Sequence, residues 1–291
     1  MVSSRFRYLA PSTIQEAASL LDRYGEGARV LAGGQSLIPL MKMRLAAPEY
    51  IIDLNRITDL EYVKEEGGVL RIGALTRHRD LENSDLVKRR YPLLADAAET
   101  IGDLQVRNLG TVGGAMAHAD PASDWGAAFL ALETEVEATS AKGIRTIPLD
   151  EFFVDTYTTA LEPGEMLTEI RVSGVRGKSG GSYKKLKRKA GDFATVGVAA
   201  QVQLDGKGAV TQGRIALTAV GPTPFRAQEA ENYLRGRTLD ETTIGEAARL
   251  AAQAAEPSAD LRGSEDYKRA MVEVFTRRAL RAAVERARGG G

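Results

Sequence analysis

Residues 29–37, with the sequence RVLAGGQSL, constrain the fold most, because they predict a strand, a glycine turn and a helix in succession. Val30 and Leu31 are typical strand residues. Gly33 and Gly34 then end the strand, since glycine adopts positive φ easily and has no Cβ to block an approaching ligand. The segment therefore predicts exposed backbone at the carboxyl end of a strand.

The helix after this turn is expected to run from Leu37 through Leu45, with Ser36 as its cap and Pro39 in its first turn. The first N–H groups of a helix lack intrahelical partners, and here they would face the glycine turn. Such a place suits a phosphate, although a glycine pair before a helix is also an ordinary tight connection. The turn alone leaves both interpretations open.

A second stretch, residues 108–125, repeats the arrangement, with glycines at 113 and 114, small residues, and a predicted helix over residues 121–132. Proline at the first position supports that helix start. Two glycine loops in one chain can hold the two ends of one long dinucleotide. A nicotinamide-type fingerprint at residues 25–27 is rejected, because those glycines precede a strand instead of following it.

The first glycine turn belongs to a predicted βαβ unit, because a strand over residues 50–54 follows the helix and should lie parallel to the first strand. Ligands collect at the carboxyl ends of parallel strands. Alternation over residues 198–204 predicts an antiparallel meander with one solvated face. The other predicted strands are 6–11, 69–74, 135–139, 144–148, 166–172, 182–188, 195–204 and 210–220; the other predicted helices are 12–25, one from Thr76, 91–101, 149–154, 225–234, 242–254 and 265–286, before a disordered tail at 289–291.

The chain contains no cysteine, so it cannot hold an iron–sulfur cluster through thiolates or form a disulfide. Its two histidines, His78 and His118, are too far apart in sequence to suggest a metal site, and His78 is interpreted as a surface residue. Lys plus Arg and Asp plus Glu both total 39, which implies no general attraction to nucleic acid. With no membrane-length apolar run and no signal segment, a cytoplasmic protein is expected.

Four motifs carry a resemblance to a known family: AGGQSL at 32–37, TVGG at 111–114, HADP at 118–121 and KLKRKAGDFA at 185–194. The chain resembles, nearly from end to end, the flavoprotein (medium) subunit of carbon monoxide dehydrogenase and related molybdenum hydroxylases, including the flavin domain of xanthine dehydrogenase. The resemblance implies an α+β fold. It comprises a PCMH-type, vanillyl-alcohol-oxidase-like FAD-binding domain of two α+β subdomains, followed by a domain of antiparallel strands and a helical bundle.

The implied FAD-binding domain spans residues 1–174, with subdomains of about 1–56 and 57–174, and the C-terminal domain spans 175–291. A glycine- and cation-rich segment at residues 173–181 supports that boundary. The implied function is electron transfer by an oxidoreductase subunit. In relatives, a large subunit with a molybdenum cofactor oxidises the substrate, and two [2Fe-2S] clusters in a small subunit pass electrons to the flavin and on to an external acceptor. A dimer of heterotrimers (a heterohexamer) is expected, cytoplasmic and associated with the inner face of the membrane through its partners.

The resemblance implies no catalytic residue and no metal ligand in this chain. It implies FAD contacts on both glycine motifs and at scattered positions elsewhere. These are Leu31, Ala32, Gly33, Gly34, Gln35, Ser36, Leu37, Ile101, Thr111, Val112, Gly113, Gly114, Ala115, His118, Asp124, Leu167, Lys185 and Phe193.

Several of these residues have a structural explanation as well. Asp124 is an acid that the dipole of a helix start favours, and Phe193 is explained by core packing. For His118 and Asp120, shaping of the loop is favoured over proton transfer. Ala115 replaces the Asn or Ser that is common in the family, which leaves only backbone contacts there.

The basic run at residues 184–189 is interpreted as the solvated face of a strand, not as a nucleic-acid patch, because it lacks interleaved aromatic residues beyond Tyr183. Within it, Lys185 matches the position that reaches the flavin, where a cation would stabilise anionic reduced flavin. The hydroxyls of Ser36 and Thr111 can bond a phosphate or ribityl oxygen, and capping or turn chemistry is their alternative role.

Two other functions use the same glycine motifs. One is a self-sufficient flavin oxidase or reductase, which would need its own acid–base groups. The other is a non-catalytic nucleotide- or phosphate-binding module. The resemblance leaves open the substrate of the complex (carbon monoxide, a purine or an aromatic compound) and the acceptor (quinone, NAD or oxygen). It also leaves open whether the isolated chain retains FAD.

Overall fold

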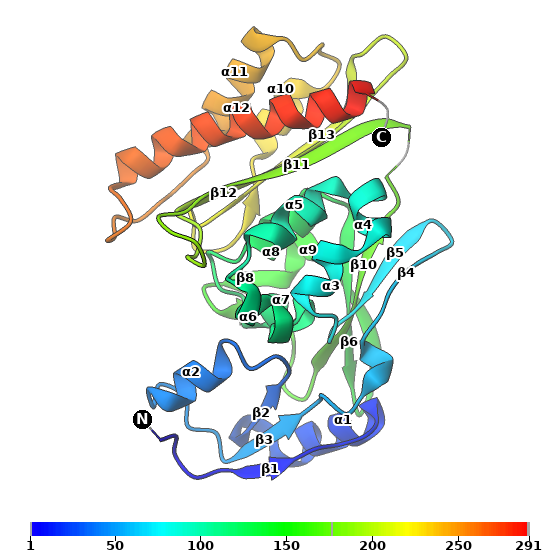
Figure 1. Cartoon of the computed structure of the whole chain (residues 1–291), viewed down its shortest axis with the longest axis vertical. Coiled ribbons are helices and arrows are strands. Elements are labelled where there is room, and N and C mark those ends of the chain that lie inside the picture. Colours follow the sequence, from blue (N-terminus) through cyan, green and yellow to red (C-terminus); the bar gives the residue numbers. More distant parts are fainter. Residues whose placement is uncertain (1, 176, 290–291) are drawn as a thin grey trace.

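The computed structural model describes residues 2–175 and 177–289. The architecture is α+β, with three larger sheets stacked along the long axis of the molecule and helices between and beside them (Figure 1). The described residues also form a small two-stranded sheet. Within these residues, no helix combines the length and the apolar character that a membrane span needs.

The N-terminal part is a three-stranded parallel sheet in the order β1-β3-β2. The predicted βαβ unit is therefore present, and Leu31 at the end of β2 pairs with Asp53 of β3. A small core forms where Ala17 and Ala18 pack near Ile52. The elements are β1 (Arg7–Leu9), α1 (Ile14–Tyr24), the 3-10 turn η1 (Gly25–Gly27), β2 (Ala28–Leu31), α2 (Leu37–Lys42), β3 (Tyr50–Asp53) and the 3-10 turn η2 (Thr58–Leu60).

The middle part has a five-stranded antiparallel sheet in the order β4-β5-β10-β6-β7. Trp125 and Phe129 stack with ring centroids 5.2 Å apart in its core. Strand β4 was not predicted, because its sequence VKEE is polar and half exposed. The elements are β4 (Val63–Glu66), β5 (Val69–Gly73), α3 (His78–Asn83), α4 (Asp85–Arg90), α5 (Pro92–Thr100), α6 (Leu104–Leu109), α7 (Val112–His118), α8 (Asp124–Leu130), β6 (Thr134–Ser140), β7 (Gly143–Pro148), α9 (Leu149–Phe152), β8 (Phe153–Asp155), β9 (Thr158–Thr159) and β10 (Met166–Ser173).

The C-terminal part is the predicted antiparallel meander, β11-β12-β13-β14, covered by helices. The expectation of one solvated face is correct for only part of the sheet, where Gln212 is exposed and its partner Gln203 is half-buried. Val198 and Ala200 of β12 pack into the core beneath α11 and α12, whereas Ala199 belongs to the core of the middle part. The part of the sheet around Ala199 is thus buried between two layers (Figure 1). The elements are β11 (Lys178–Leu186), β12 (Val196–Leu204), β13 (Val210–Thr218), β14 (Phe225–Arg226), α10 (Gln228–Leu234), α11 (Glu241–Gln253) and α12 (Glu265–Gly289).

Helix ends near the glycine motifs differ from the predictions. Helix α2 stops at Lys42 instead of Leu45, and Arg44 has a φ of 61°, which a continuing helix cannot accommodate. Helix α8 begins at Asp124, not at Pro121, because the Asp120 carboxylate accepts the N–H of Ala122 at 2.8 Å and closes a turn.

Two further predictions concern the ends of segments. Thr76 does not cap α3, since its hydroxyl donates to the carbonyl of Tyr62 at 2.9 Å. Of the predicted disordered tail, Gly289 is the last residue of α12, and residues 290–291 lie outside the described residues.

Candidate functional site

The two glycine motifs are in direct contact, although they are far apart in sequence. A Cβ placed on Gly33 would lie 2.2 Å from the carbonyl oxygen of Leu109 and 2.7 Å from the Cα of Gly110. A Cβ on Gly114 would lie 3.7 Å from that of Ala32. Only glycine at position 33 permits this approach, so the sequence brings both motifs to one place, where α6 and α7 face the loop after β2 (Figure 1).

Arg77 and Asn55 join the two motifs by hydrogen bonds. The Arg77 guanidinium donates to the carbonyl of Leu109 and, at 2.7 Å, to the side-chain oxygen of Asn55. The Asn55 amide donates in turn to the carbonyl of Ala32 at 2.9 Å. Sequence reasoning missed both residues, because neither belongs to a recognisable motif.

The first glycine motif presents free backbone donors. Gly34 has a φ of +73°, and in the described part of the chain the N–H groups of Gly34, Gln35 and Ser36 find no acceptor. Ser36 precedes α2 but forms no side-chain cap, so the predicted capping is wrong and its hydroxyl is not used there. Three adjacent N–H groups and a hydroxyl without partners among the described residues are donors that suit an anion.

The second motif is not a loop, since Gly113 and Gly114 lie in the first turn of α7. Thr111 caps this helix by accepting the N–H of Gly114 at 3.2 Å. Gly113 donates to the carbonyl of Ala74 at 3.0 Å, and a Cβ on it would lie 2.5 Å from the Cβ of Ala74. The N–H groups of Gly113 and Gly114 already donate within the protein, so they are not free donors for a phosphate.

A buried polar cluster lies where α8 meets the C-terminal sheet. Asp124 accepts from the Tyr183 hydroxyl at 2.6 Å and from Lys185 Nζ at 2.8 Å, and Lys185 also donates to the carbonyl of Thr100 at 3.1 Å. Burial raises the pKa of Asp124 against the opposing charge of Lys185, and it raises the pKa of Tyr183 well above the ordinary value. The interpretation of Lys185 as part of a solvated strand face is wrong, since its side chain is 2% exposed.

The loop between β11 and β12 carries Phe193, which is 48% exposed and so not explained by core packing. The neighbouring Asp192 bonds Arg262 and Arg188 at 3.1 and 3.0 Å. Hydrogen bonds from these two guanidinium groups lower the pKa of Asp192 to about 2. A loop that supports an exposed aromatic ring is thereby anchored to the segment before α12.

The remaining predicted residues lie around these groups. The ring of His118 lies against Tyr157, with centroids 5.2 Å apart, and Tyr157 donates to Asp120 at 3.4 Å, which supports a loop-shaping role for that region. Ile101 follows α5 at the edge of the middle core. Leu167 is buried in β10.

His78 is buried, contrary to its interpretation as a surface residue. Its Nδ1 atom accepts a hydrogen bond from Trp125 Nε1 at 3.0 Å. Burial, and then the charges of Arg107 and Arg77, lower the pKa of His78 to about 4. This burial could not be predicted from the sequence, because the histidine lies in a polar helix.

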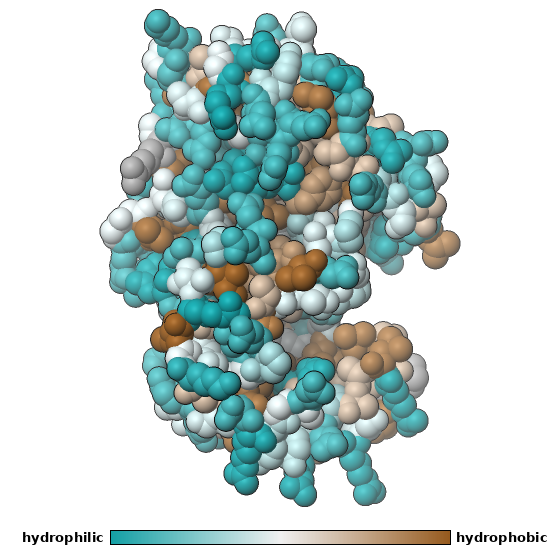
Figure 2. Space-filling model, turned by 180° about the vertical axis from the view of Figure 1, so that it is seen from behind, coloured by the Kyte–Doolittle hydropathy of each residue, from teal (hydrophilic) through white to brown (hydrophobic). Residues whose placement is uncertain are grey.

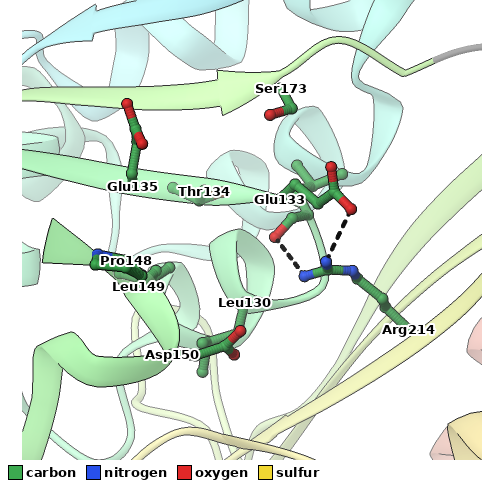
Figure 3. Close-up of a pocket in the computed structure, with 10 residues that line it drawn as sticks. Leu130, Glu133, Thr134, Glu135, Pro148, Leu149, Asp150, Ser173 and Arg214 are labelled. Carbon is green, nitrogen blue, oxygen red and sulfur yellow. Dashed lines mark hydrogen bonds and ion pairs between the residues drawn. The ribbon is translucent and has the colours of Figure 1, made fainter. Parts of the chain in front are cut away.

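The cavity in Figure 3, of about 190 Å³, lies elsewhere, between β6, α9 and β13. Its Arg214 bonds Glu133 at 3.1 Å, and none of the predicted site residues lines it. On the face seen in Figure 2, the molecule is instead hollowed between the N-terminal part and the body above it, beside apolar side chains over α2. Ile38, Met43 and Leu45 are exposed in that region.

Comparison with known proteins covers almost the whole chain. Residues 4–172 match the family described as the FAD binding domain in molybdopterin dehydrogenase, and residues 181–283 match the CO dehydrogenase flavoprotein C-terminal domain. The carbon monoxide dehydrogenase medium chain of Hydrogenophaga pseudoflava is 45% identical, over 97% of this chain and 98% of that protein. The glyceraldehyde dehydrogenase medium chain of Sulfolobus acidocaldarius is 40% identical, over 97% and 99%.

A solved structure of carbon monoxide dehydrogenase from Hydrogenophaga pseudoflava superposes with a TM-score of 0.95 and 47% identity, covering 98% of this chain and 99% of that chain. The sequence motifs, the fold and the similarity over the full length all indicate the same family. The chain therefore belongs to the family of FAD-binding medium subunits of carbon monoxide dehydrogenase-type molybdenum hydroxylases, and it is an FAD-binding oxidoreductase subunit.

Proposed function

We propose that this chain binds FAD between its two glycine motifs and passes electrons from the [2Fe-2S] clusters of a partner subunit to an external acceptor. The observation that carries the proposal is the set of free N–H groups of Gly34, Gln35 and Ser36 beside the second motif. These groups offer hydrogen bonds and positive electrostatic potential to the FAD pyrophosphate.

The residues present fit the cofactor. Gly33 lets the two motifs approach each other, since a Cβ there would meet Leu109 and Gly110, and Gly34 adopts the positive φ of the turn that carries the free donors. The Thr111 hydroxyl accepts from Gly114 and keeps its own proton for a ribityl or phosphate oxygen. The proposed contacts remain all those that the sequence resemblance implied, with Gly113 and Gly114 acting through packing and space instead of free N–H groups.

Lys185 is proposed to face the redox ring. An ammonium group has three donors, and two of them bond Asp124 and Thr100, which leaves one for the cofactor. Its positive charge favours an anionic reduced ring, while Ile101 and Phe193 shield the ring from water. Bound FAD supplies the redox chemistry itself, and the chain supplies position and electrostatics.

The division into domains 1–174 and 175–291, with subdomains of about 1–56 and 57–174, stays part of the proposal. Three hydrophobic cores support a three-part organisation, although the core of the middle part also includes Tyr183, Ala199 and Ala216. The parts are therefore packed against one another.

The partners are proposed from the names of the relatives and from the absence of cysteine. The term medium chain in the relatives' names implies a larger and a smaller subunit. Because this chain has no cysteine, iron–sulfur clusters that supply its electrons would be bound by another subunit. We propose a large subunit with the molybdenum cofactor and a small subunit with two [2Fe-2S] clusters, in a dimer of heterotrimers. We also propose a cytoplasmic location, at the inner face of the membrane through the partners.

The experiment is co-purification of the native complex, followed by flavin, molybdenum and iron analysis and by anaerobic addition of candidate substrates. We expect one FAD per medium chain and bleaching of its visible absorption only when both partner subunits are present. Bleaching of the isolated chain by a substrate would support the self-sufficient oxidase instead. A colourless complex that binds nucleotides would support the phosphate-binding module.

A further inference from the structure

His78 connects two segments of the proposed FAD site without belonging to either. Its backbone N–H donates to the carbonyl of Gly110, directly before the second glycine motif, at 3.0 Å. Its Nδ1 atom accepts from Trp125, which follows Asp124, at 3.0 Å. A Cβ on Gly110 would lie 2.7 Å from Nε2, so the ring fills the space beside this glycine.

The bond to Trp125 determines the protonation state of His78. An indole N–H only donates, so Nδ1 must be unprotonated, and the neutral ring carries its proton on Nε2. Burial of the ring opposes a second proton most, and the charges of Arg107 on α6 and Arg77 on its own segment add to this effect. The carboxylate of Glu82 accepts a hydrogen bond from Arg107 at 2.7 Å. A doubly protonated ring would lose the bond to Trp125.

We propose that His78 is a positioning residue for FAD: its neutral imidazole packs beside Gly110 and accepts from Trp125, which keeps the start of the second glycine motif and the start of α8 in fixed relation. This inference rests on the proposed function, because it assumes that Thr111 and Asp124 contact the cofactor. His78 acts only through these segments.

Substitution of His78 tests the proposal in the full-length chain, by titration of FAD into the flavin-free protein. His78→Asn keeps an acceptor near the position of Nδ1, whereas His78→Leu keeps the bulk without an acceptor. We expect His78→Leu to weaken FAD binding by about tenfold or more, since it leaves the Trp125 N–H buried and unpaired, and His78→Asn by less than about threefold. Trp125 is the only tryptophan, so quenching of its emission reports binding at this place.

Equal FAD affinity in His78→Leu and the wild type would overturn the inference. An equal loss of FAD affinity in His78→Leu and His78→Asn would overturn it as well. Folding of each variant is checked by its thermal unfolding without FAD. If His78→Leu does not fold, the wild type and His78→Asn are titrated with FAD between pH 6.5 and 3.5, a range that brackets the pKa of about 4 of folded His78. Wild-type affinity and Trp125 emission should change with acidification while those of His78→Asn change less, and parallel profiles would overturn the inference.

Gly34→Val in the same titration separates this inference from the proposed site. If Gly34→Val loses FAD while His78→Leu binds it normally, only the positioning role fails. If both bind FAD normally, the proposed site itself is wrong.

Discussion

The two glycine pairs look alike in sequence but have different structural roles. At Gly33 and Gly34, positive φ and a close approach leave backbone donors free. At Gly113 and Gly114, the backbone is helical and its donors are used, so glycine is needed for contact with Ala74 and for the Thr111 cap. A Gly-Gly pair thus predicts close backbone contacts. Whether an anion can bind there depends on whether the N–H groups of the pair and its neighbours already donate to acceptors within the protein.

Gly34→Val should produce the largest effect on FAD. Valine disfavours a φ of +73°, and its Cβ would lie 2.6 Å from Ile38 Cδ1, so the turn must change shape. We expect FAD affinity to fall by at least about a hundredfold, or roughly 2.7 kcal/mol. Gly68→Val is the matched control, because Gly68 has a φ of +79° and open space around its Cβ position. Normal flavin content in soluble Gly34→Val would contradict the assignment.

Acidification should loosen the second motif through His78. The unfolded histidine takes up a proton near its ordinary value of 6.5, whereas the folded one resists until about 4. The free energy of unfolding is therefore unaffected by His78 above pH 6.5. It decreases as the pH falls from 6.5 to about 4, by about 3 kcal/mol in total. Urea unfolding at several pH values measures this loss, and His78→Asn should show a shallower slope. An unchanged slope would show that another group titrates.

Gly113→Ala should affect stability more than flavin binding. The added methyl group would lie 2.5 Å from the Cβ and 2.7 Å from the carbonyl oxygen of Ala74, and such overpacking costs about 1–3 kcal/mol. Gly245→Ala is the control, since a Cβ there would only approach the flexible Arg277 side chain at 3.4 Å, and alanine should stabilise α11 by up to about 1 kcal/mol. If Gly113→Ala lost FAD as completely as Gly34→Val without losing stability, the contrast between the two pairs would be wrong.

Thr111→Val should produce the smallest effect on stability. It removes the cap that accepts from Gly114 at 3.2 Å, and the loss of such a cap costs about 1 kcal/mol. Thr111→Ser keeps the hydroxyl and should remain close to the wild type in thermal unfolding. Equal unfolding temperatures for the valine and serine variants would show that the cap contributes nothing.

Much of the fold was predictable because local periodicity and turn residues agree with it. The βαβ unit and the meander β11-β12-β13 follow from strand-like runs between glycine-rich turns. Strand β4 could not be predicted, since a polar edge strand of four residues has no apolar alternation. The burial around Ala199 on the second face of the meander was not predicted. Alanine and glycine alternate there with valine, and these small residues occur on solvated faces as well as on packed ones.

The candidate site was predicted as a set of residues but not as a network. Asp124 and Lys185 were both expected at the cofactor, whereas their ion pair and the bond from the Tyr183 hydroxyl form only because two side chains of β11 reach the start of α8 in the folded chain. Arg77 and Asn55 act through contacts with residues distant in sequence, which no local motif encodes. Asp192 lies in a family motif, but its bond to Arg262 is also a contact between distant segments.

By itself, the sequence determined the two glycine motifs, the absence of cysteine and the family, because these depend on residue types and short spacings. The tertiary structure decided which glycine N–H groups stay free, that His78 is neutral and buried, and that Lys185 faces a carboxylate. These properties depend on which groups from distant segments meet away from water, and hydrogen bonding and pKa follow from that environment and not from residue type.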